Sequence, residues 1–206
     1  MAVSALVIYL VWALLAFGLR SWVQRRRTGD AGFRGTGLDP RTAQWRVRAL
    51  FAGAVLTGFA GPVAELAGLA AVGVLDHPAV RGGGLVVAVA GVAATVAAQW
   101  SMGASWRIGV DERERTELVT TGAFTLARNP IFTAMIATSA GLAAMVPNLI
   151  ALVALALTVV AIELQVRVVE EPYLARVHGD AYARYGADVG RFVPWMGRLH
   201  SSRPSA

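Results

Sequence analysis

Charged side chains crowd the end of the last long apolar stretch of the chain. Glu163, Arg167, Glu170 and Glu171 are spaced by three or four residues, so on a helix they lie on one face. Two adjacent carboxylates are more than Arg167 can neutralise, and negative charge is unfavourable near a helix C-terminus. A cationic or hydroxyl-bearing ligand would account for the excess. The alternative that the spacing leaves open is an ion-pair ladder that only stabilises the helix end.

A second group of interest is the sequence Arg128-Asn129-Pro130, which precedes another apolar stretch. Proline suits the first turn of a helix, and Asn129 is favoured in an extended conformation from which it can cap that helix. A helix N-terminus offers free N–H groups and partial positive charge, and Arg128 adds a bidentate donor. The pattern predicts either a site for a ligand carboxylate or a capped membrane helix with an anchoring arginine.

Aromatic residues recur at helical spacing after these groups, at Tyr182 and Tyr185. They predict either the wall of a pocket at the level of the lipid head groups or an ordinary interfacial belt. Trp106 and Arg107 follow the third apolar stretch and are also typical of an interface.

The elements that must position these residues are predicted to be membrane-spanning helices. Of the 206 residues 56% are hydrophobic and 16% are charged, whereas a soluble domain carries about a quarter charged residues. A chain of this size cannot bury so much apolar surface, so the sequence predicts an all-α, multi-pass transmembrane bundle of about five spans with a C-terminal cytoplasmic amphipathic helix. The predicted spans are Ala2–Val23, Ala49–Leu75, Gly84–Ser101, Ile131–Val146 and Leu149–Val169.

Two features of these spans are informative. Only Pro147-Asn148 separates the last two, which predicts a tight transmembrane hairpin over residues 131–169. Glu65 lies deep in the second span, where a carboxyl group must be paired or protonated, and the sequence does not identify its partner. The first span is expected to be retained, because its arginines follow the apolar stretch, unlike those of a signal peptide.

The distribution of arginine predicts the orientation. All 19 basic residues are arginine, and cytoplasmic loops are enriched in basic residues. The loop at 24–48, the stretch at 102–128 and the C-terminal tail lie on one side of the predicted bundle, and Arg81 is the only arginine on the other. We expect the N-terminus outside the cell membrane and the C-terminus in the cytoplasm. Because the charge follows topology in this way, no nucleic-acid partner is expected.

Several site classes are not expected. The chain has no cysteine, which excludes disulfides and thiolate chemistry. His77, His178 and His200 are too far apart in sequence to form a metal-binding pair, so no metal is expected. The glycine clusters at 32–37 and 82–84 lack the strand-then-helix context of a phosphate-binding loop and are interpreted as plain loop.

Taken in order, the polar pieces of the second half resemble the isoprenylcysteine carboxyl methyltransferase and phospholipid methyltransferase superfamily. The resemblance covers roughly residues 100–194, and no single piece is as specific as the ordered set. The pieces are Met102–Gly109, Leu118-Val119, Gly122–Phe124, Arg128–Phe132, Glu170–Leu174, Gly179, Tyr182, Tyr185 and Arg191–Pro194.

The resemblance implies S-adenosylmethionine held at the cytoplasmic face by the half 102–206, while residues 1–101 supply the first three spans. It also implies a lipophilic or lipidated acceptor that enters from the bilayer lipid: an isoprenylcysteine-like carboxylate, or a lipid amine or carboxylate. Asn129 and Phe132 replace a histidine and a tyrosine of the family motif, so a role that needs an imidazole is lost. The implied cofactor-binding residues are Val119, Gly122, Phe124, Arg128, Asn129, Pro130, Glu170, Glu171, Tyr182 and Tyr185.

Methyl transfer from an activated donor requires alignment and the exclusion of water. Arg167 or Arg107 is the candidate catalytic anchor for a carboxylate acceptor, and Glu163 the candidate base for an amine. This hypothesis requires that the carboxylate pair and the Arg128–Pro130 segment converge on one pocket. Two alternatives stay open: an NADPH-dependent sterol-type reductase, against which the paired carboxylates count, and a non-catalytic member of the same fold.

Overall fold

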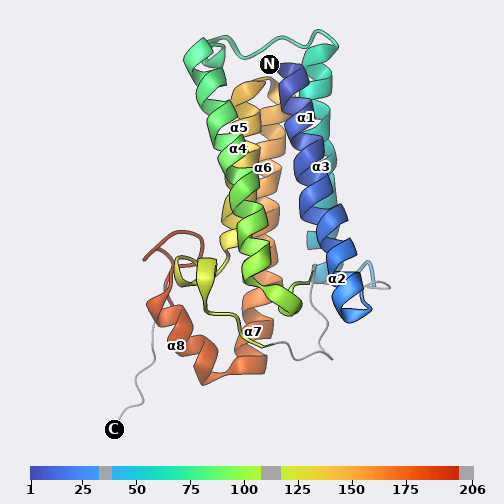
Figure 1. The fold of residues 1–206 in the computed structure, drawn as a ribbon. Coiled ribbons are helices and arrows are strands. Elements are labelled where there is room, and N and C mark those ends of the chain that lie inside the picture. The colour runs from blue at the N-terminus through green and yellow to red at the C-terminus, as the bar shows by residue number, and fades with distance from the viewer. Residues whose placement is uncertain (33–38, 108–116, 200–206) are drawn as a thin grey trace.

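The computed structural model describes residues 1–32, 39–107 and 117–199, and all regular structure in those ranges is helical. The helices run antiparallel in one elongated bundle, with the N-terminus at the end opposite to α7 and α8 (Figure 1). Besides three short 3₁₀ helices, the elements are α1 (Ala2–Ala13), a π-helical segment (Leu14–Leu19), α2 (Arg20–Thr28), α3 (Ala43–Leu66), α4 (Pro78–Ser101), α5 (Pro130–Met145), α6 (Leu149–Leu164), a second π-helical segment (Gln165–Glu170), α7 (Glu171–His178) and α8 (Asp180–Asp188).

Four continuous helices in the described residues are long and apolar enough to cross a membrane. They are Ala2–Thr28, Ala43–Leu66, Pro78–Ser101 and Leu149–His178. The fifth, α5, is apolar but has only 16 residues, about 24 Å at the rise of an α-helix, less than the roughly 30 Å of a bilayer core. The predicted all-α membrane bundle is confirmed, with four full-length helices and one short one.

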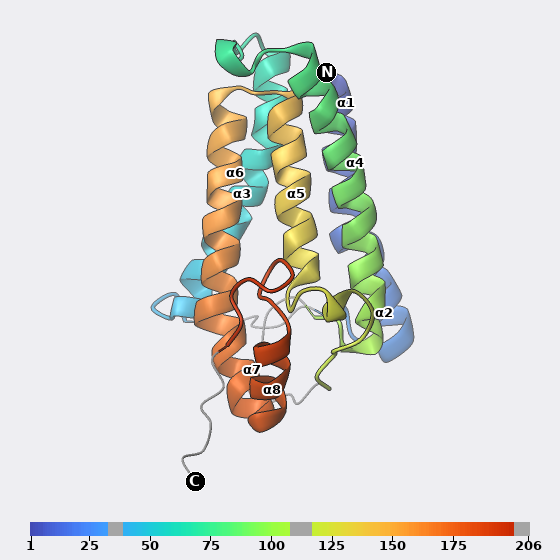
Figure 2. The ribbon, with the colours of Figure 1, turned by 90° about the vertical axis from the view of Figure 1, so that its left-hand side faces the viewer.

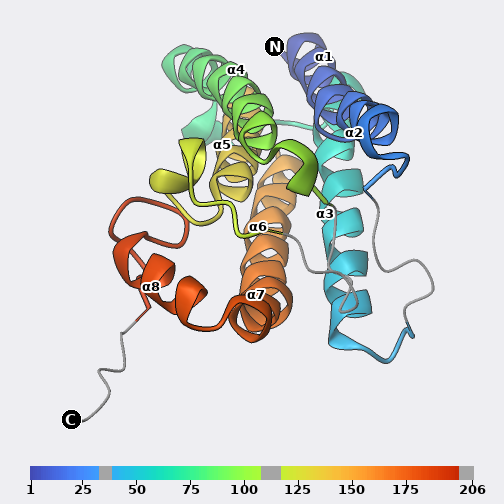
Figure 3. The same cartoon turned by 60° about the horizontal axis from the view of Figure 1, so that its bottom comes forward.

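The short helix leaves one end of the bundle open. The first turn of α5 lies inside the bundle, short of the end to which α4 and the continuous helix of α6 and α7 extend (Figure 2). That end carries α2, the start of α3, the loop after α4, and α7 and α8, and we call it the arginine-rich end. Figure 3 brings it forward and shows α8 and the loop before α5 on one side of α6, with α3 on the other.

The start of α4 differs from the prediction. The helix begins at Pro78 rather than Gly84, with the Nδ1 of His77 accepting a hydrogen bond of 3.2 Å from the N–H of Ala79. Most of the expected loop at 76–83 is therefore helical, although glycines at 82–84 disfavour a helix. Tertiary packing overrides that preference. The other glycine cluster, at 32–37, lies almost wholly outside the described residues.

Small residues let α4 and α5 approach very closely. A Cβ on Gly141 would lie 2.3 Å from the backbone nitrogen of Ala88, and one on Gly91 would lie 2.7 Å from the backbone nitrogen of Thr138. Gly84 is equally close to α5, since a Cβ there would lie 2.7 Å from the carbonyl oxygen of Gly141. Such small-residue contacts stabilise helix pairs in lipid, where apolar burial drives no association. This stripe makes α4 the main neighbour of α5, while α6 packs chiefly along α3.

The opposite end of the bundle supplies the partner of Glu65. Arg81 donates one hydrogen bond of 2.7 Å to Glu65 and another of 2.7 Å to Asp76, and a third of 2.8 Å to the carbonyl oxygen of Met145. In the turn between α5 and α6, the fully buried Asn148 donates to the carbonyl of Gly61 and accepts from the N–H of Ala151. Together these contacts tie α3, α4, α5 and α6 to one another.

The tail also departs from the expectation of a single amphipathic helix. It forms two short helices, α7 and α8, which meet at Gly179. The φ angle of Gly179 is +49°, in a region that side chains disfavour. The bend returns residues 189–198 to the start of α5, where the N–H of Arg128 donates to the carbonyl of Gly190 at 2.8 Å.

Candidate functional site

A cavity of about 240 Å³ lies at the arginine-rich end, in the space left by the short α5. Its walls come from both halves of the chain: the first π-helical segment, α3, the end of α4, the loops on either side of residues 108–116, and the region from α5 to α8. Eight aromatic side chains line it, which are Phe17, Phe51, Trp106, Phe124, Phe132, Tyr173, Tyr182 and Tyr185. Aromatic faces attract cations, and the cavity has both acidic and basic side chains on its walls.

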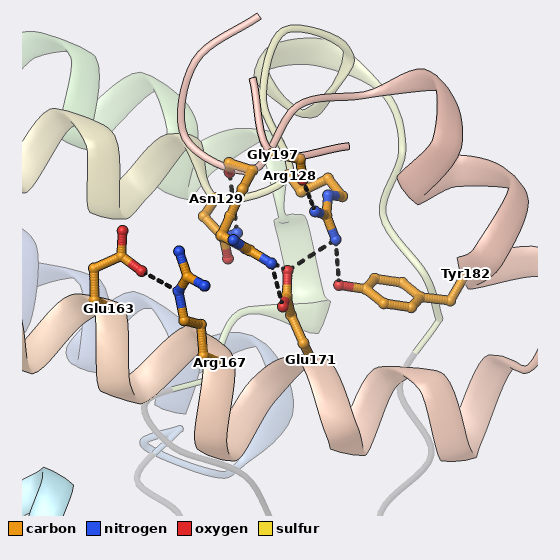
Figure 4. A network of polar contacts seen from close by, with 8 residues as sticks. Arg128, Asn129, Glu163, Arg167, Glu171, Tyr182 and Gly197 are labelled. Atoms are coloured by element: carbon orange, nitrogen blue, oxygen red, sulfur yellow. Dashed lines mark hydrogen bonds and ion pairs between the residues drawn. The ribbon is translucent and has the colours of Figure 1, made fainter. Parts of the chain in front are cut away.

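The two adjacent carboxylates where the second π-helical segment joins α7, Glu170 and Glu171, have different environments. Glu171 accepts two hydrogen bonds from Arg191, of 2.8 and 2.9 Å, and forms an ion pair of 2.9 Å with Arg128 (Figure 4). The side chain of Arg128 is only 1% exposed. The carboxylate at 171 is therefore engaged in holding two arginines, and the Arg191 guanidinium has a raised pKa because of its hydrogen bonds to Glu171.

Glu170 is the carboxylate left for a ligand. It ends the second π-helical segment and lines the cavity, and the one hydrogen bond identified for it within the described residues comes from the Nε2 of Gln165 at 3.1 Å. π-helical turns inside α-helices are frequent at functional sites, since the extra residue redirects a side chain. Here the π-helical segment directly precedes α7, whose first residue, Glu171, forms ion pairs with Arg128 and Arg191.

Arg128 connects the start of α5 to α8. Its Nη1 donates to the hydroxyl of Tyr182 at 2.9 Å, and its Nη2 donates to the carbonyl of Gly197 at 2.7 Å. Beside it the hydroxyl of Tyr185 donates to the carbonyl of Phe124 at 2.7 Å. Burial raises the pKa of Tyr185 to about 12 and also raises that of Tyr182. Both phenols are therefore neutral at physiological pH.

Asn129 occupies the N-cap position of α5, but its side chain does not cap the helix as expected. Its Nδ2 instead donates to the carbonyl of Arg191 at 3.1 Å, and the hydroxyl of Thr133 donates to the carbonyl of Phe192 at 2.6 Å. The returning C-terminal segment competes successfully for these groups. No local sequence pattern predicts these contacts, because the competing carbonyls of Arg191 and Phe192 are about 60 residues away along the chain.

Most of the residues predicted for cofactor binding are brought together, and the carboxylate pair lines the same cavity as the Arg128–Pro130 segment. Gly122 does not line the cavity; its φ angle is +62° and a Cβ there would lie 3.0 Å from the hydroxyl of Ser101, so it shapes the turn behind the wall. The predicted residues that line the cavity are Arg107, Val119, Phe124, Arg128, Asn129, Pro130, Glu170, Glu171, Tyr182 and Tyr185.

Glu163 and Arg167 are placed differently from the catalytic prediction. They pair with each other at 2.5 Å across one helical turn, with 37% and 56% of their side chains exposed, and neither lines the cavity. Figure 4 shows the pair beside the Glu171 network rather than within it. The alternative interpretation of these two residues, an ion-pair ladder, describes their geometry. Of the predicted catalytic residues, Arg107 alone lines the cavity.

The first helices contribute to this site in a way that the motifs did not predict. Arg20 is 4% exposed and donates to the carbonyl of Gly103 at 2.5 Å, while its guanidinium lies 4.8 Å from the ring centre of Trp106. Gln99 donates to the carbonyl of Ala16 at 2.9 Å. A signal existed in the four-residue spacing of Arg20 and Gln24, two polar residues on one face of an apolar helix. Both are buried, and Arg20 donates to Gln24 at 3.3 Å.

The sequence model of a known protein family matches part of the chain. Residues 80–181 match the sequence model of the phospholipid methyltransferase family. The chain belongs to this family of integral-membrane methyltransferases. No curated protein sequence matches the chain. In this member of the phospholipid methyltransferase family, the matched segment runs from α4 into α8. It therefore contains the Arg128–Pro130 segment, Glu170 and Glu171, whereas α1 to α3 lie outside it.

Proposed function

We propose that the protein is an S-adenosylmethionine-dependent methyltransferase that transfers a methyl group to a lipophilic acceptor at the cytoplasmic face of the cell membrane. The observation that carries the proposal is the cavity at the arginine-rich end, where Glu170 and a set of aromatic rings face the same space. Membership of a methyltransferase family supports the reaction class. The concentration of arginine at this end supports its cytoplasmic assignment.

The side chains present fit the chemical groups of this cofactor. Its amino group and ribose hydroxyls are donors, and Glu170 has acceptor capacity beyond the bond from Gln165. Its sulfonium is a cation, which aromatic faces and carboxylates favour. When bound, S-adenosylmethionine supplies a methyl group that is already activated for transfer.

Arg128 has a different role from the one the sequence suggested. Its two Nη atoms are engaged with Tyr182, Glu171 and Gly197, so it is less suited to bind a ligand carboxylate. We assign it to positioning: it joins the start of α5 to α7 and α8, and thereby holds the acidic wall of the cavity in place. Free N–H groups of the first turn of α5 remain the better candidates for a carboxylate.

The opposite wall is suited to the acceptor. Phe17, Arg48 and Phe51 come from helices outside the family segment, and Arg107, which follows α4, lines the same cavity. Aligning the acceptor against a fixed donor and excluding water are the tasks these side chains would perform. For a carboxylate acceptor, Arg107 or Arg48 would provide the positive anchor, and no base is required.

The test is thermal unfolding of the detergent-solubilised protein with S-adenosylhomocysteine or with NADPH. A ligand that binds only the folded state raises its stability, by about 2.7 kcal/mol at a hundred times its dissociation constant. We expect stabilisation by S-adenosylhomocysteine that is lost in Glu170→Gln and retained in Glu163→Gln, a matched carboxylate outside the cavity. Stabilisation by NADPH alone, or equal behaviour of the two variants, would contradict the proposal.

A further inference from the structure

The chain after α8 folds into a turn that lies at the side of the bundle. The N–H of Arg191 donates to the carbonyl of Met196 at 2.7 Å, and the N–H of Met196 donates to the carbonyl of Val193 at 3.3 Å. We call residues 190–197 the tail turn. Figures 1 and 2 show it outside the helices, beside the start of α5. It lines neither the cavity that contains Glu170 nor a smaller one among α1, α3, α5 and α6.

Hydrogen bonds to the first turn of α5 fix the height of the tail turn along the bundle. The hydroxyl of Thr133 donates to the carbonyl of Phe192 at 2.6 Å, and the N–H of Asn129 donates to the carbonyl of Arg191 at 3.1 Å. Because α5 is shorter than the hydrocarbon core of a bilayer, both of its ends lie close to the boundary between hydrocarbon and head groups. The tail turn is therefore attached at the level of this boundary.

The backbone of the tail turn is suited to surroundings that contain little water. Irregular backbone is costly in lipid unless its polar groups have partners within the protein. In this turn six carbonyl groups accept hydrogen bonds from protein donors. They belong to Gly190, Arg191, Phe192, Val193, Met196 and Gly197. A turn with so many paired carbonyls can lie at the membrane surface without leaving those groups unsatisfied.

The tip of the tail turn presents large apolar side chains to the outside. Trp195 is 76% exposed and Met196 is 68% exposed, and Val193 beside them is also exposed. The φ angle of Trp195 is +65°, a region that a bulky side chain rarely adopts. Such a conformation persists only where the surrounding structure imposes it, and it is commonly found where a segment has a function. The hydrogen bonds of the turn thus hold the indole outward.

Other exposed tryptophans lie at the same end of the bundle. They are Trp22 in α2, Trp45 in the first turn of α3 and Trp100 in the last turn of α4. Tryptophan is enriched at the level of the lipid head groups, where it forms an aromatic belt. The helices α5 to α8 contain no tryptophan. Trp195 therefore extends the belt to the side of the bundle formed by the second half of the chain.

We propose that residues 193–196 insert into the head-group region of the leaflet at the arginine-rich end and anchor the C-terminal segment to the bilayer. The partner is the lipid surface, which accepts the indole of Trp195 and the side chain of Met196. Arg198, which follows the turn, is exposed and is placed to meet lipid phosphates. Because Arg191 of the same turn binds Glu171, the anchor also ties α7 to the membrane surface.

The test uses the absence of cysteine from the chain, since one introduced cysteine then carries a nitroxide label at a single position. Met196→Cys reports on the tail turn. Two exposed positions are the references: Ala156→Cys, within the membrane-spanning α6, and Ala183→Cys, on α8. The labelled proteins are placed in vesicles of phosphatidylcholine and phosphatidylglycerol. Electron paramagnetic resonance then measures the accessibility of each label to oxygen, which concentrates in lipid, and to a polar nickel complex, which stays in water.

We expect the ratio of oxygen to nickel accessibility at position 196 to lie between the ratios at positions 156 and 183. Adding Trp195→Ser to the Met196→Cys protein should shift the ratio toward that of position 183, because the indole is lost. Its matched control is Trp195→Phe, which keeps an aromatic ring and should keep most of the depth. All of these proteins should melt together in detergent, since the exposed tip packs on little of the bundle.

A label at position 196 that is as accessible to the nickel complex as the label at position 183 would overturn the proposal, and would leave the tip as a surface for a soluble partner. A ratio equal to that of position 156 would overturn the placement in the head-group region. An unchanged ratio in Trp195→Ser would also contradict the proposal, because insertion would not depend on the indole. None of these measurements uses a cofactor or an acceptor, so their outcome is independent of the proposed methyltransferase activity.

Discussion

The separation of structural and ligand-binding roles between Glu171 and Glu170 makes the sharpest prediction. Glu171→Gln removes the charge that holds Arg128 and Arg191. Breaking one side of a buried ion pair costs about 3–5 kcal/mol, because the remaining charge is left buried and unpaired. The side chains of Glu171 and Arg191 are 14% and 16% exposed, so we take the lower end of that range, about 3 kcal/mol.

For a chain of this length each kcal/mol shifts the melting temperature by about 2–4 °C. Glu171→Gln should therefore melt about 6–12 °C below the unaltered protein. Glu170→Gln conserves size and can still accept the hydrogen bond from Gln165, so its melting temperature should change little. It should instead weaken S-adenosylhomocysteine binding about 10- to 150-fold, the value of one hydrogen bond to a charged group.

The assay is thermal unfolding of both variants in one detergent, with and without S-adenosylhomocysteine. Glu163→Gln is the control on the same helix, and should cost less than about 1 kcal/mol because its partner is exposed. An unchanged melting temperature for Glu171→Gln would refute the reasoning, since the network could then not be buried as described. Equal loss of stability in Glu170→Gln would refute the division of roles.

Three further outcomes follow from other contacts. Gly141→Ala should destabilise the bundle by about 1–3 kcal/mol, since its Cβ would meet the backbone of Ala88. Its control is Gly83→Ala, which has open space around it and should be neutral or stabilising. Equal melting temperatures of the two variants would contradict the close α4–α5 contact. Asn148→Ala should cost about 1–3 kcal/mol in chemical unfolding, because it leaves the carbonyl of Gly61 buried without its partner; a smaller loss would show that water reaches this turn. The free energy of unfolding should fall between about pH 10, where tyrosine ionises in the unfolded chain, and about pH 12, the raised pKa of Tyr185. In this interval only the unfolded state releases the Tyr185 proton. Tyr185→Phe should show a shallower decline over the same interval, and an identical slope would count against burial of the phenol.

The sequence by itself determined the class of the fold and the region of the site. Long apolar stretches admit few structures other than membrane helices, because an unpaired backbone is too costly in lipid. The Pro147-Asn148 turn predicted the hairpin, and the ordered motifs from Met102 to Pro194 indicated the family. These signals are local, so each can be recognised without knowing what lies across the bundle.

The tertiary structure decided which side chains face the cavity. Glu170 and Glu171 are adjacent in sequence, yet they differ in role because Arg191 returns from the C-terminal segment to bind only Glu171. Glu163 and Arg167 share their helical face but pair with each other outside the cavity. The Glu163–Arg167 pair follows the helical spacing, whereas the difference between Glu170 and Glu171 depends on a partner that is distant in sequence, about which helical periodicity carries no information.

The same reason explains why the sequence did not indicate that α1 to α3 contribute to the site. Their sequences have no motif, and Arg20, Phe17 and Phe51 carry no functional signal in isolation. Packing against Trp106 and Met135 gives them a place in the site. Composition determined that these helices cross a membrane, whereas only the close packing of α3 on α6 and of α4 on α5 determined that they line two cavities, which share Phe51 and Met135.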